Sequence, residues 1–517
     1  MADASRPLDR WRQALHRKSI DVVVADTERA GLQRKLGAGS LLILGIANIL
    51  GAGIYVMTGE AAASFAGPAV LLSFMLAALA CGFTGLCYAE LSSVIPVSGS
   101  AYSYCYVTLG EGCAWALGWM VILEYVLSAS AVAAGFAGYL TSLLADVGVH
   151  VPAWLATSTL TALQQDGHTV LAGSGGINLV AALAVLVTAC VLIAGVSQSA
   201  LVNAVLVVIK VAVLVSFIVV GARYVDGAHW QPFLPPNEGG FAYGWPGVLR
   251  AAAMLFFAYL GFETVSMAAS ETRNPRRDVP FGILGSLVVC TLLYIAAGAV
   301  LTGIVPFREL GVPDPVAVAV DRMGWPWFAV LIKIGALTGL GSVLLANGYG
   351  VSRVAVNIGR DGLLPKLFAH VHKTRRTPWL GNLTFGVIAA VLAALLPIGV
   401  LGDLICLGIA SAFIVVCIAV MWLRSVRPEL VGGFRVPLGG VWIGKAWIGT
   451  VPVLGIVLCL TMMAPVLGDM IQQVRRGDPL PALILAGYVL AGALIYFFYG
   501  QRHARRLAHA NPPSPES

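Results

Sequence analysis

The stretch Ile49-Leu50-Gly51-Ala52-Gly53-Ile54-Tyr55 places two glycines around one alanine in the middle of the first long apolar run of the chain. Glycine costs about 1 kcal/mol relative to alanine in the interior of a helix. Two glycines so close together, halfway along a run long enough to cross a bilayer, therefore predict a helix that unwinds at this point.

The composition around this stretch is that of a membrane protein. Hydrophobic residues make up 58% of the chain and charged residues only 11%, whereas soluble domains carry about 25% charged residues. A bilayer core needs about 20 apolar residues per helical crossing, and helices satisfy their own backbone polar groups in lipid. The predicted fold class is therefore an all-α polytopic membrane protein with about twelve transmembrane helices. These spans are expected near residues 37–57, 68–91, 114–144, 177–196, 200–222, 246–269, 281–304, 327–355, 379–398, 401–423, 447–468 and 480–500.

The distribution of basic residues predicts the orientation of the chain. Of the 32 Lys and Arg residues, 24 lie in the termini and alternate loops, and six lie on the opposite side. By the positive-inside rule both termini are cytoplasmic. Because the net charge of +7 is spread over these loops, it indicates a lipid bilayer as the partner and no nucleic acid. The first 35 residues have no apolar segment typical of a signal peptide.

A second interrupted run occupies span 6, at residues 256–263 with the sequence FFAYLGFE. It comes five spans after the first interruption. Because each span crosses the membrane once, an odd number of crossings means that the unit beginning with span 6 would enter the membrane from the opposite side to the unit beginning with span 1. This predicts an inverted repeat of spans 1–5 and 6–10. Interrupted spans in corresponding positions of two halves are the best sequence indication of a transporter's binding site. The predicted parts are a cytoplasmic N-terminal segment (1–35), a transport core (36–424), spans 11 and 12 (425–500) and a cytoplasmic tail (501–517).

The backbone at such a break offers two kinds of group to a ligand. Freed N–H groups and the positive dipole end of the outer half-helix suit a carboxylate, and freed carbonyls of the inner half suit an ammonium group. Close helix packing is the alternative explanation for the small residues of Gly51-Ala52-Gly53. The eight histidines all fall in termini and loops, and the nine cysteines are scattered singly. We therefore expect no metal site, no cofactor and no enzymatic activity.

Two charged residues lie deep within predicted spans. Lys210 is ten residues into span 5, too deep to reach the interface comfortably. Burial disfavours the charged form of a lysine and nearby carbonyls or acids favour it, which is how a reversible proton carrier could be built. A permanent cation that fixes span 5 against span 1 is the alternative. Glu124 in span 3 is expected to line the substrate pocket, or else to pair with Lys210 or bond as a neutral acid.

Span 8 offers a face of small residues, Gly335, Gly339, Gly341 and Ser342, which would leave room for a substrate side chain or serve helix packing. Glu263 follows the break in span 6 and is expected to cap the second half of that span, or else to take a gating or proton role. Lys333 lies nearer an interface and is expected to anchor span 8 there.

Five motifs in order resemble the amino acid-polyamine-organocation superfamily, and within it bacterial members of the cationic amino acid transporter family. They are Gly51-Ala52-Gly53-Ile54, Pro96-Val97-Ser98-Gly99-Ser100-Ala101-Tyr102, residues 256–263, Glu271-Thr272-Arg273-Asn274-Pro275 leading to Pro280, and Arg360-Asp361-Gly362-Leu363-Leu364-Pro365. The resemblance runs from about Arg17 to beyond span 12. It implies the leucine-transporter-type fold, with spans 11 and 12 appended, in the inner (plasma) membrane of a bacterium.

The resemblance also implies roles for residues at the two breaks. The substrate carboxylate would lie on Gly51, Ala52 and Gly53. Because relatives often have a hydroxyl residue where this chain has Ala52, binding here would rest on the backbone alone. The amino group would meet carbonyls near Ile49 and around Phe257, Ala258 and Leu260, and Phe257 or Tyr259 would close the site from outside. Lys210 stands where sodium-coupled relatives bind sodium, and it is the candidate proton-coupling residue.

The sequence thus predicts a secondary amino acid transporter, driven by protons and working by alternating access. An exchanger or exporter of cationic amino acids or polyamines, or a membrane amino acid sensor, remains the alternative. The sequence leaves open the choice between neutral and basic substrates. It equally leaves open a homodimer or a small accessory membrane subunit.

Overall fold

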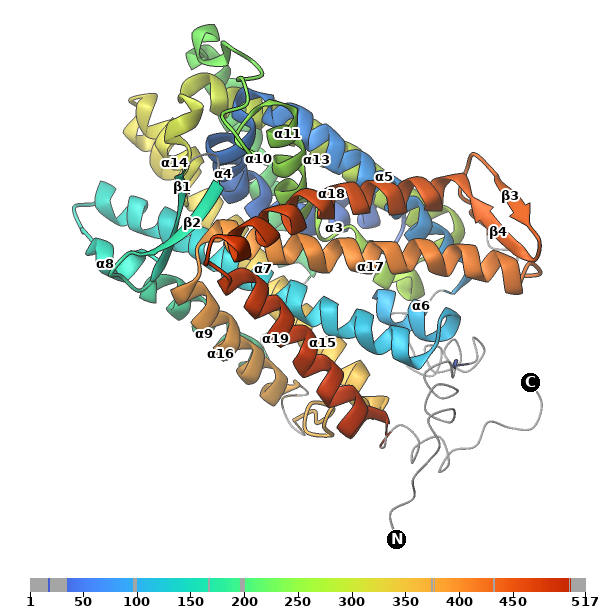
Figure 1. Ribbon diagram of the computed structural model, residues 1–517. Helices are drawn as coiled ribbons and strands as arrows, with labels where there is room; N and C mark the ends of the chain where they lie inside the picture. The colour runs from blue at the N-terminus through green and yellow to red at the C-terminus, as the bar shows by residue number, and fades with distance from the viewer. Residues whose placement is uncertain are drawn as a thin grey trace.

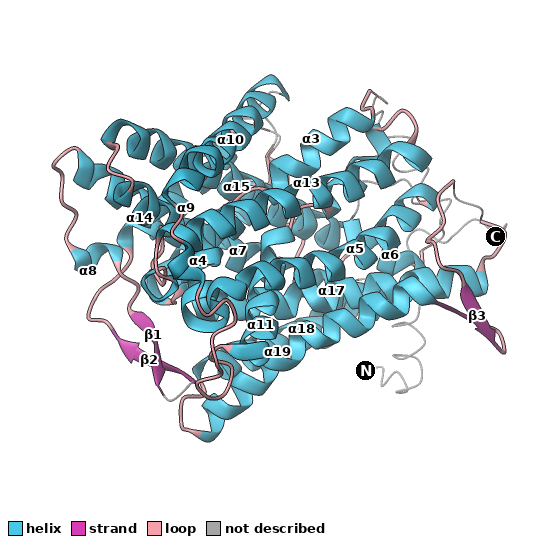
Figure 2. Ribbon diagram, turned by 90° about the horizontal axis from the view of Figure 1, so that it is seen from above, coloured by secondary structure: helices cyan, strands magenta, loops and turns pink. Residues whose placement is uncertain are grey.

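The structure is a computed structural model, and it describes residues 17–18, 35–95, 100–165, 168–195, 200–372, 375, 377–430, 433–501 and 503. Most of the predicted N-terminal segment and tail, and residues 96–99 of the second motif, lie outside the described residues. The described chain is a bundle of long helices with two short hairpins (Figures 1 and 2). This confirms the predicted helical fold class.

The first span is interrupted where the two glycines predict it. Helix α3 (Ala38–Ile49) ends at Leu50, whose extended backbone (φ −75°, ψ 101°) leaves the helical path. The chain resumes as a π-helical turn, η1 (Gly53–Met57). Its outer continuation and the next long helix are α4 (Thr58–Ala61), η2 (Ala62–Ala66), η3 (Gly67–Ala69) and α5 (Val70–Val94).

The sixth span is interrupted as well. Helix α11 (Gly244–Leu255) tightens into a 3₁₀ turn, η6 (Phe256–Tyr259), and Leu260 is then extended (ψ 134°). Gly261 has φ 120°, a conformation that an L side chain rarely adopts, so glycine is required at this position. The span resumes as α12 (Glu263–Met267) and η7 (Ala268–Glu271). Both predicted breaks are therefore present.

The remaining long helices lie in the apolar stretches that follow the first break. Within the described residues, nine helices are long and apolar enough to cross a membrane, and α9 and α16 are shorter apolar helices. The first of the nine runs from Ala38 to Val94, and its 57 residues are more than a single crossing of about 20 residues needs. The count of twelve spans stays a prediction. The helices are α6 (Ser100–Thr108), α7 (Glu111–Asp146), α8 (Ala153–Ala156), α9 (Leu179–Ala194), α10 (Ala200–Gly221), α13 (Pro275–Ile304), α14 (Pro315–Arg322), α15 (Pro326–Arg360), α16 (Trp379–Leu395), α17 (Ile398–Val426), α18 (Thr450–Arg475) and α19 (Leu480–Ile495), with the short turns η4 (Ala222–Tyr224), η5 (Gly227–Trp230), η8 (Phe307–Glu309) and η9 (Tyr496–Gly500).

Two antiparallel hairpins lie at opposite ends of the bundle (Figures 1 and 2). Strands β1 (Leu160–Gln165) and β2 (His168–Gly173) pair in the loop between α7 and α9. Strands β3 (Gly440–Ile443) and β4 (Ala446–Gly449) pair between α17 and α18. The predicted topology places these two loops on opposite sides of the membrane, and this stays a prediction.

Small residues let the helices approach closely around the breaks. A Cβ added to Gly282 of α13 would come within 2.7 Å of Leu41 Cβ of α3, and one added to Gly85 of α5 within 3.0 Å of Ile283. Helix α13 therefore packs against α3 with little space between the backbones, and against α5 with the Ile283 side chain in close contact with Gly85. Large apolar side chains such as Leu79, Val208 and Leu292 lie exposed midway along their helices, which is where lipid replaces water as the neighbour.

Candidate functional site

The two breaks lie against each other in the centre of the bundle. A Cβ added to Gly53 would come within 2.5 Å of Ala258 Cα and would overlap the Ala258 side chain. A Cβ added to Gly261 would lie 2.7 Å from the carbonyl carbon of Asn48. Each of these glycines is therefore needed because the backbone of the other broken span leaves no space for a methyl group.

The side chain of Asn48 adds a polar link between the two spans. Its Nδ2 donates to Leu44 O at 3.0 Å and to Thr264 Oγ1 at 2.8 Å. The Thr264 hydroxyl donates in turn to Gly261 O at 2.6 Å. The end of α3 and the start of α12 are thus held by one connected set of hydrogen bonds, which the sequence analysis did not identify.

The break in span 1 frees carbonyl groups at the end of α3, and Lys210 of α10 binds two of them. Its Nζ donates to Ala47 O at 3.1 Å and to Leu50 O at 3.4 Å. Lys210 is only 2% exposed. The ammonium group therefore lies at the negative, C-terminal end of α3, where the helix dipole favours a cation. The contact between span 5 and span 1 is present, and the transport role of Lys210 stays a prediction.

The other face of the first break lies against span 8. A Cβ added to Gly51 would come within 2.6 Å of Val343 Cγ2 of α15. Ala52 is buried and its methyl group carries no hydrogen-bonding atom. Ala52 itself therefore offers a ligand only its backbone groups.

The predicted residues of span 6 are buried beside the first break. The Tyr259 hydroxyl donates to Phe74 O of α5 at 3.1 Å, while Phe257 and Leu260 are 5% and 8% exposed. One carboxylate oxygen of Glu263 accepts a hydrogen bond from the Gly261 N–H at 2.8 Å. Glu263 thus binds a backbone donor at the break, just before α12, and its capping role stays a prediction.

Glu124 of α7 is buried and faces α17 rather than the lysine. A Cβ added to Gly408 of α17 would lie 3.5 Å from Glu124 Cβ, and Glu263 is close enough for the two carboxylates to interact electrostatically. Because the Lys210 ammonium group binds the carbonyls of Ala47 and Leu50, the pairing of Glu124 with Lys210 is the less favoured of the alternatives.

The small residues of span 8 face several different neighbours. Gly335 packs against Val213 of α10, and a Cβ on Gly339 would lie near both Lys210 and Tyr55. A Cβ on Gly341 would meet only Phe136 of α7, at an ordinary 3.8 Å. Ser342 donates its hydroxyl to Gly339 O at 2.8 Å within its own helix. Close packing therefore explains Gly335, whereas Gly339 and Gly341 both have space for a Cβ at ordinary contact distances.

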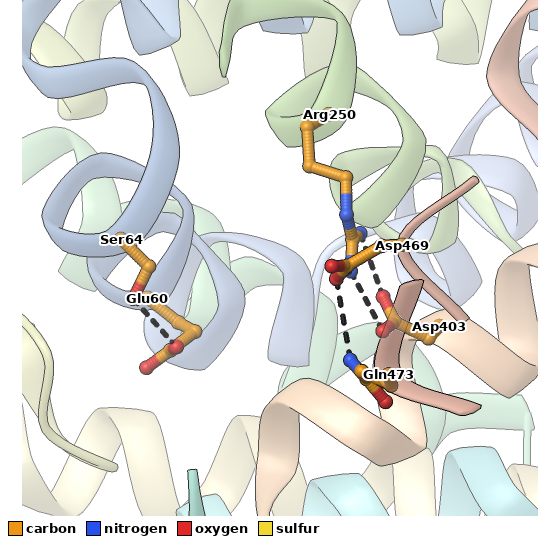
Figure 3. A network of polar contacts seen from close by, with 6 residues as sticks. All are labelled: Glu60, Ser64, Arg250, Asp403, Asp469 and Gln473. Carbon is orange, nitrogen blue, oxygen red and sulfur yellow. Dashed lines mark hydrogen bonds and ion pairs between the residues drawn. The ribbon is translucent and has the colours of Figure 1, made fainter. Parts of the chain in front are cut away.

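A buried ionic cluster joins spans 6, 10 and 11, as Figure 3 shows. Arg250 of α11 points toward Asp403 of α17 and Asp469 of α18. Its Nη1 and Nη2 each lie 2.7 Å from an Asp403 oxygen, and Nη2 lies 3.3 Å from Asp469. Its guanidinium also lies 4.7 Å from the centre of the Phe65 ring in η2. In the sequence, Arg250 is one of the six basic residues on the side opposite the termini.

The sequence held one signal for this cluster. Arg250 is followed directly by the apolar run AAAML, and a charge within an apolar helix requires a buried partner. Asp403 and Asp469 also interrupt apolar runs. The spacing along the chain could not show which of these residues meet. Glu60, which bonds to Ser64 at 2.9 Å, lies to one side of the cluster (Figure 3).

A helical bundle with two broken spans in contact defines the class of protein, a multi-span transporter rather than an enzyme. The family model described as amino acid permease matches residues 36–492. The chain belongs to this amino acid permease family of the amino acid-polyamine-organocation superfamily.

Two curated relatives from Bacillus subtilis match nearly the whole chain, and a human relative matches a smaller part of it. The methylthioribose transporter of Bacillus subtilis is 40% identical over 94% of this chain and 98% of its own length. The branched-chain amino acid permease BcaP of the same organism is 38% identical over 95% of this chain and 98% of its own length. Human cationic amino acid transporter 4 is 34% identical over 77% of this chain and 61% of its own length.

Proposed function

We propose that the protein takes up an amino acid together with protons by alternating access. The substrate carboxylate binds the backbone at Gly51, Ala52 and Gly53, and the substrate ammonium binds the carbonyls of Ile49 and Ala258. Rocking of one helix bundle against the rest exposes this site to each side of the membrane in turn.

The observation that carries the proposal is the contact between the two breaks. Gly53 lies against Ala258, so freed N–H groups of one span and freed carbonyls of both spans lie in one small region. An α-amino acid is a ligand with a carboxylate and an ammonium group one carbon apart. A site built from backbone donors and acceptors of two unwound segments matches that pair of charges.

Proton coupling is assigned to Lys210. In its charged form the ammonium group satisfies the carbonyls of Ala47 and Leu50. Loss of the proton would remove the charge and weaken this link between span 5 and the inner half of span 1. A lysine is suited to this task because burial and neighbouring dipoles oppose each other in setting its charge. Protonation would thus favour one arrangement of the inner half-helix over another.

The substrate side chain would extend toward α7 and α15. Glu124, Gly341 and Ser342 are proposed to line this part of the site, with Phe257, Tyr259 and Leu260 covering it. The space beside Gly341 supports this assignment. BcaP and human cationic amino acid transporter 4 are named for branched-chain and cationic substrates, so neutral and basic amino acids are both candidates.

The transport core is proposed to consist of spans 1–5 and 6–10 as inverted repeats, within 36–424, followed by spans 11 and 12 in 425–500. The protein would lie in the bacterial inner membrane with its N-terminal segment (1–35) and tail (501–517) in the cytoplasm. The position of the two hairpins at opposite ends of the bundle supports this topology.

Uptake into proteoliposomes tests the proposal. Labelled leucine, alanine, lysine, arginine and methylthioribose are offered with and without an inward proton gradient. The expected result is accumulation of at least one amino acid that requires the gradient. Uptake that depends only on an internal amino acid would identify an exchanger, and binding without uptake would identify a sensor. Transport of methylthioribose alone would overturn recognition of an amino acid backbone.

A further inference from the structure

The side chain of Tyr294 joins the two breaks directly. Tyr294 lies on α13, is fully buried, and its hydroxyl oxygen is 2.7 Å from Ile49 O and 3.0 Å from Ala258 O. Its ring is fixed by Phe74, at a centroid distance of 5.4 Å, and by Tyr259, at 5.6 Å. One hydroxyl group from a third span is therefore held against one freed carbonyl of each broken span.

The Tyr294 hydroxyl oxygen and the carbonyl oxygens of Ile49 and Ala258 can each form further hydrogen bonds. A tyrosine hydroxyl has a single proton, so it donates fully to only one of the two carbonyls at a time. Each carbonyl oxygen has two lone pairs, and the hydroxyl oxygen can also accept. The group consisting of Ile49 O, Ala258 O and Tyr294 Oη thus has lone pairs to spare, with the Gly51 N–H as a backbone donor facing Tyr294 Oη.

An ammonium group has the complementary pattern, with three N–H donors and no acceptor. The other carbonyls at the end of α3 are already occupied, because Lys210 donates to Ala47 O and Leu50 O. A second cationic group at this helix end would therefore bind at Ile49 O, where the partner is a hydroxyl rather than an ammonium.

We propose that Tyr294 is a positioning residue for the ammonium group of the substrate. Its hydroxyl holds the carbonyls of Ile49 and Ala258 close together and contributes the third acceptor to the ammonium group. This inference rests on the amino acid transport proposed above and adds a residue of span 7 to the recognition of the amino acid backbone.

Tyr294→Phe tests the inference because it removes only the hydroxyl group. Tyr139→Phe is the matched control, since Tyr139 is also fully buried and donates to a carbonyl of the first span, Tyr55 O, at 2.7 Å. Both variants are compared with the wild type in proteoliposomes, using leucine or the best-transported amino acid of the panel. The competitors are the matching carboxylic acid without the amino group and the matching amine without the carboxylate, which for leucine are 4-methylpentanoate and isopentylamine.

The expected result is a KM for the amino acid about tenfold higher in Tyr294→Phe, the effect of losing one hydrogen bond to a charged group. Inhibition by the amine weakens in parallel, inhibition by the carboxylic acid stays within about twofold, and the maximal rate changes less than KM. Tyr139→Phe leaves the preference for the amine over the carboxylic acid unchanged. Equal weakening of both competitors, or no change, overturns the inference while leaving the proposed function intact. Absence of amino acid uptake by the wild type overturns the proposed function and the inference with it.

Discussion

Arg250 of α11 and Asp403 of α17 form a two-pronged ion pair in the interior of the bundle, with both nitrogen–oxygen distances at 2.7 Å. Arg250 is 1% exposed, and Asp469 of α18 lies on its other side. A buried guanidinium between two carboxylates cannot be removed without leaving negative charge uncompensated. Arg250 and the two carboxylates therefore hold α11, the first part of span 6, against spans 10 and 11.

Replacing this arginine should destabilise the protein strongly. Arg250→Met is expected to lower the free energy of unfolding by about 3–5 kcal/mol, the cost of leaving buried charge unpaired. Thermal unfolding of the protein in detergent measures the effect. Arg308→Ala is the matched control, because its ion pair with Glu238 is exposed and such pairs contribute about 0–1 kcal/mol. Similar melting temperatures for the two variants would contradict the role given to Arg250.

Removing the Lys210 ammonium group should separate proton coupling from binding. Lys210→Ala is expected to abolish uptake driven by a pH gradient, because nothing else donates to the carbonyls of Ala47 and Leu50 in the described hydrogen bonds. Uptake at a fixed internal pH is measured with and without the gradient. Lys445→Ala changes an exposed lysine of the β3–β4 hairpin and should behave like the wild type. Unchanged gradient-driven uptake in Lys210→Ala would refute the coupling role.

The contact between Gly53 and Ala258 can be tested by adding a methyl group at residue 53 and removing the one at residue 258. Gly53→Ala is expected to reduce uptake at least tenfold, because the new methyl would overlap the Ala258 side chain and overpacking costs about 1–3 kcal/mol. The double variant with Ala258→Gly should recover much of the activity. Gly82→Ala is the control, since a Cβ at Gly82 meets no atom within 4 Å. Failure of the double variant to recover would show that Gly53 is needed for its backbone conformation instead.

A pH-dependent effect is expected at Asp314, in the loop before α14. Burial raises the pKa of its carboxyl above the ordinary value of 3.8, although the Lys333 ammonium opposes this shift. The folded state therefore binds the proton more tightly than the unfolded state. Stability should fall as the pH rises from about 3.8 through the raised pKa, and the full cost is present above it.

Asp314→Asn should accordingly raise the melting temperature at pH 7 and give no gain at pH 4 and below. The aspartate makes no side-chain cap to α14, so the substitution removes charge without removing a helix cap. Glu429→Gln, at an exposed residue, serves as the control and should show no such difference. A gain in stability that is equal at both pH values would contradict the assignment.

The positions of the breaks could be predicted from the sequence because they depend on local properties. Glycine pairs weaken a helix wherever they occur, and Gly261 needs a backbone conformation that only glycine adopts readily. The depth of Lys210 along its span likewise followed from counting residues. The helical fold and the family were confirmed, whereas the roles of the individual site residues stay predictions.

Other parts of the site depend on which spans meet, and a single sequence does not contain that information. Tyr294 lies within an apolar span, where an aromatic residue is typical of packing, and its two carbonyl partners are 245 and 36 residues away. Lys333 was expected only to anchor span 8 near an interface. It is fully buried between Asp146 and Asp321, at 2.7 and 2.8 Å, which bind it from two other helices.

The close approach of Gly53 to Ala258 and of Gly261 to Asn48 also limits how the protein can move. Because the two broken segments touch at two separate points, they can rotate together as one unit. They cannot slide along each other without a steric clash. The central segments of spans 1 and 6 should therefore move together as one rigid body. A pathway to either side of the membrane would then open when the surrounding spans move away from this rigid unit. The two broken spans would not separate from each other.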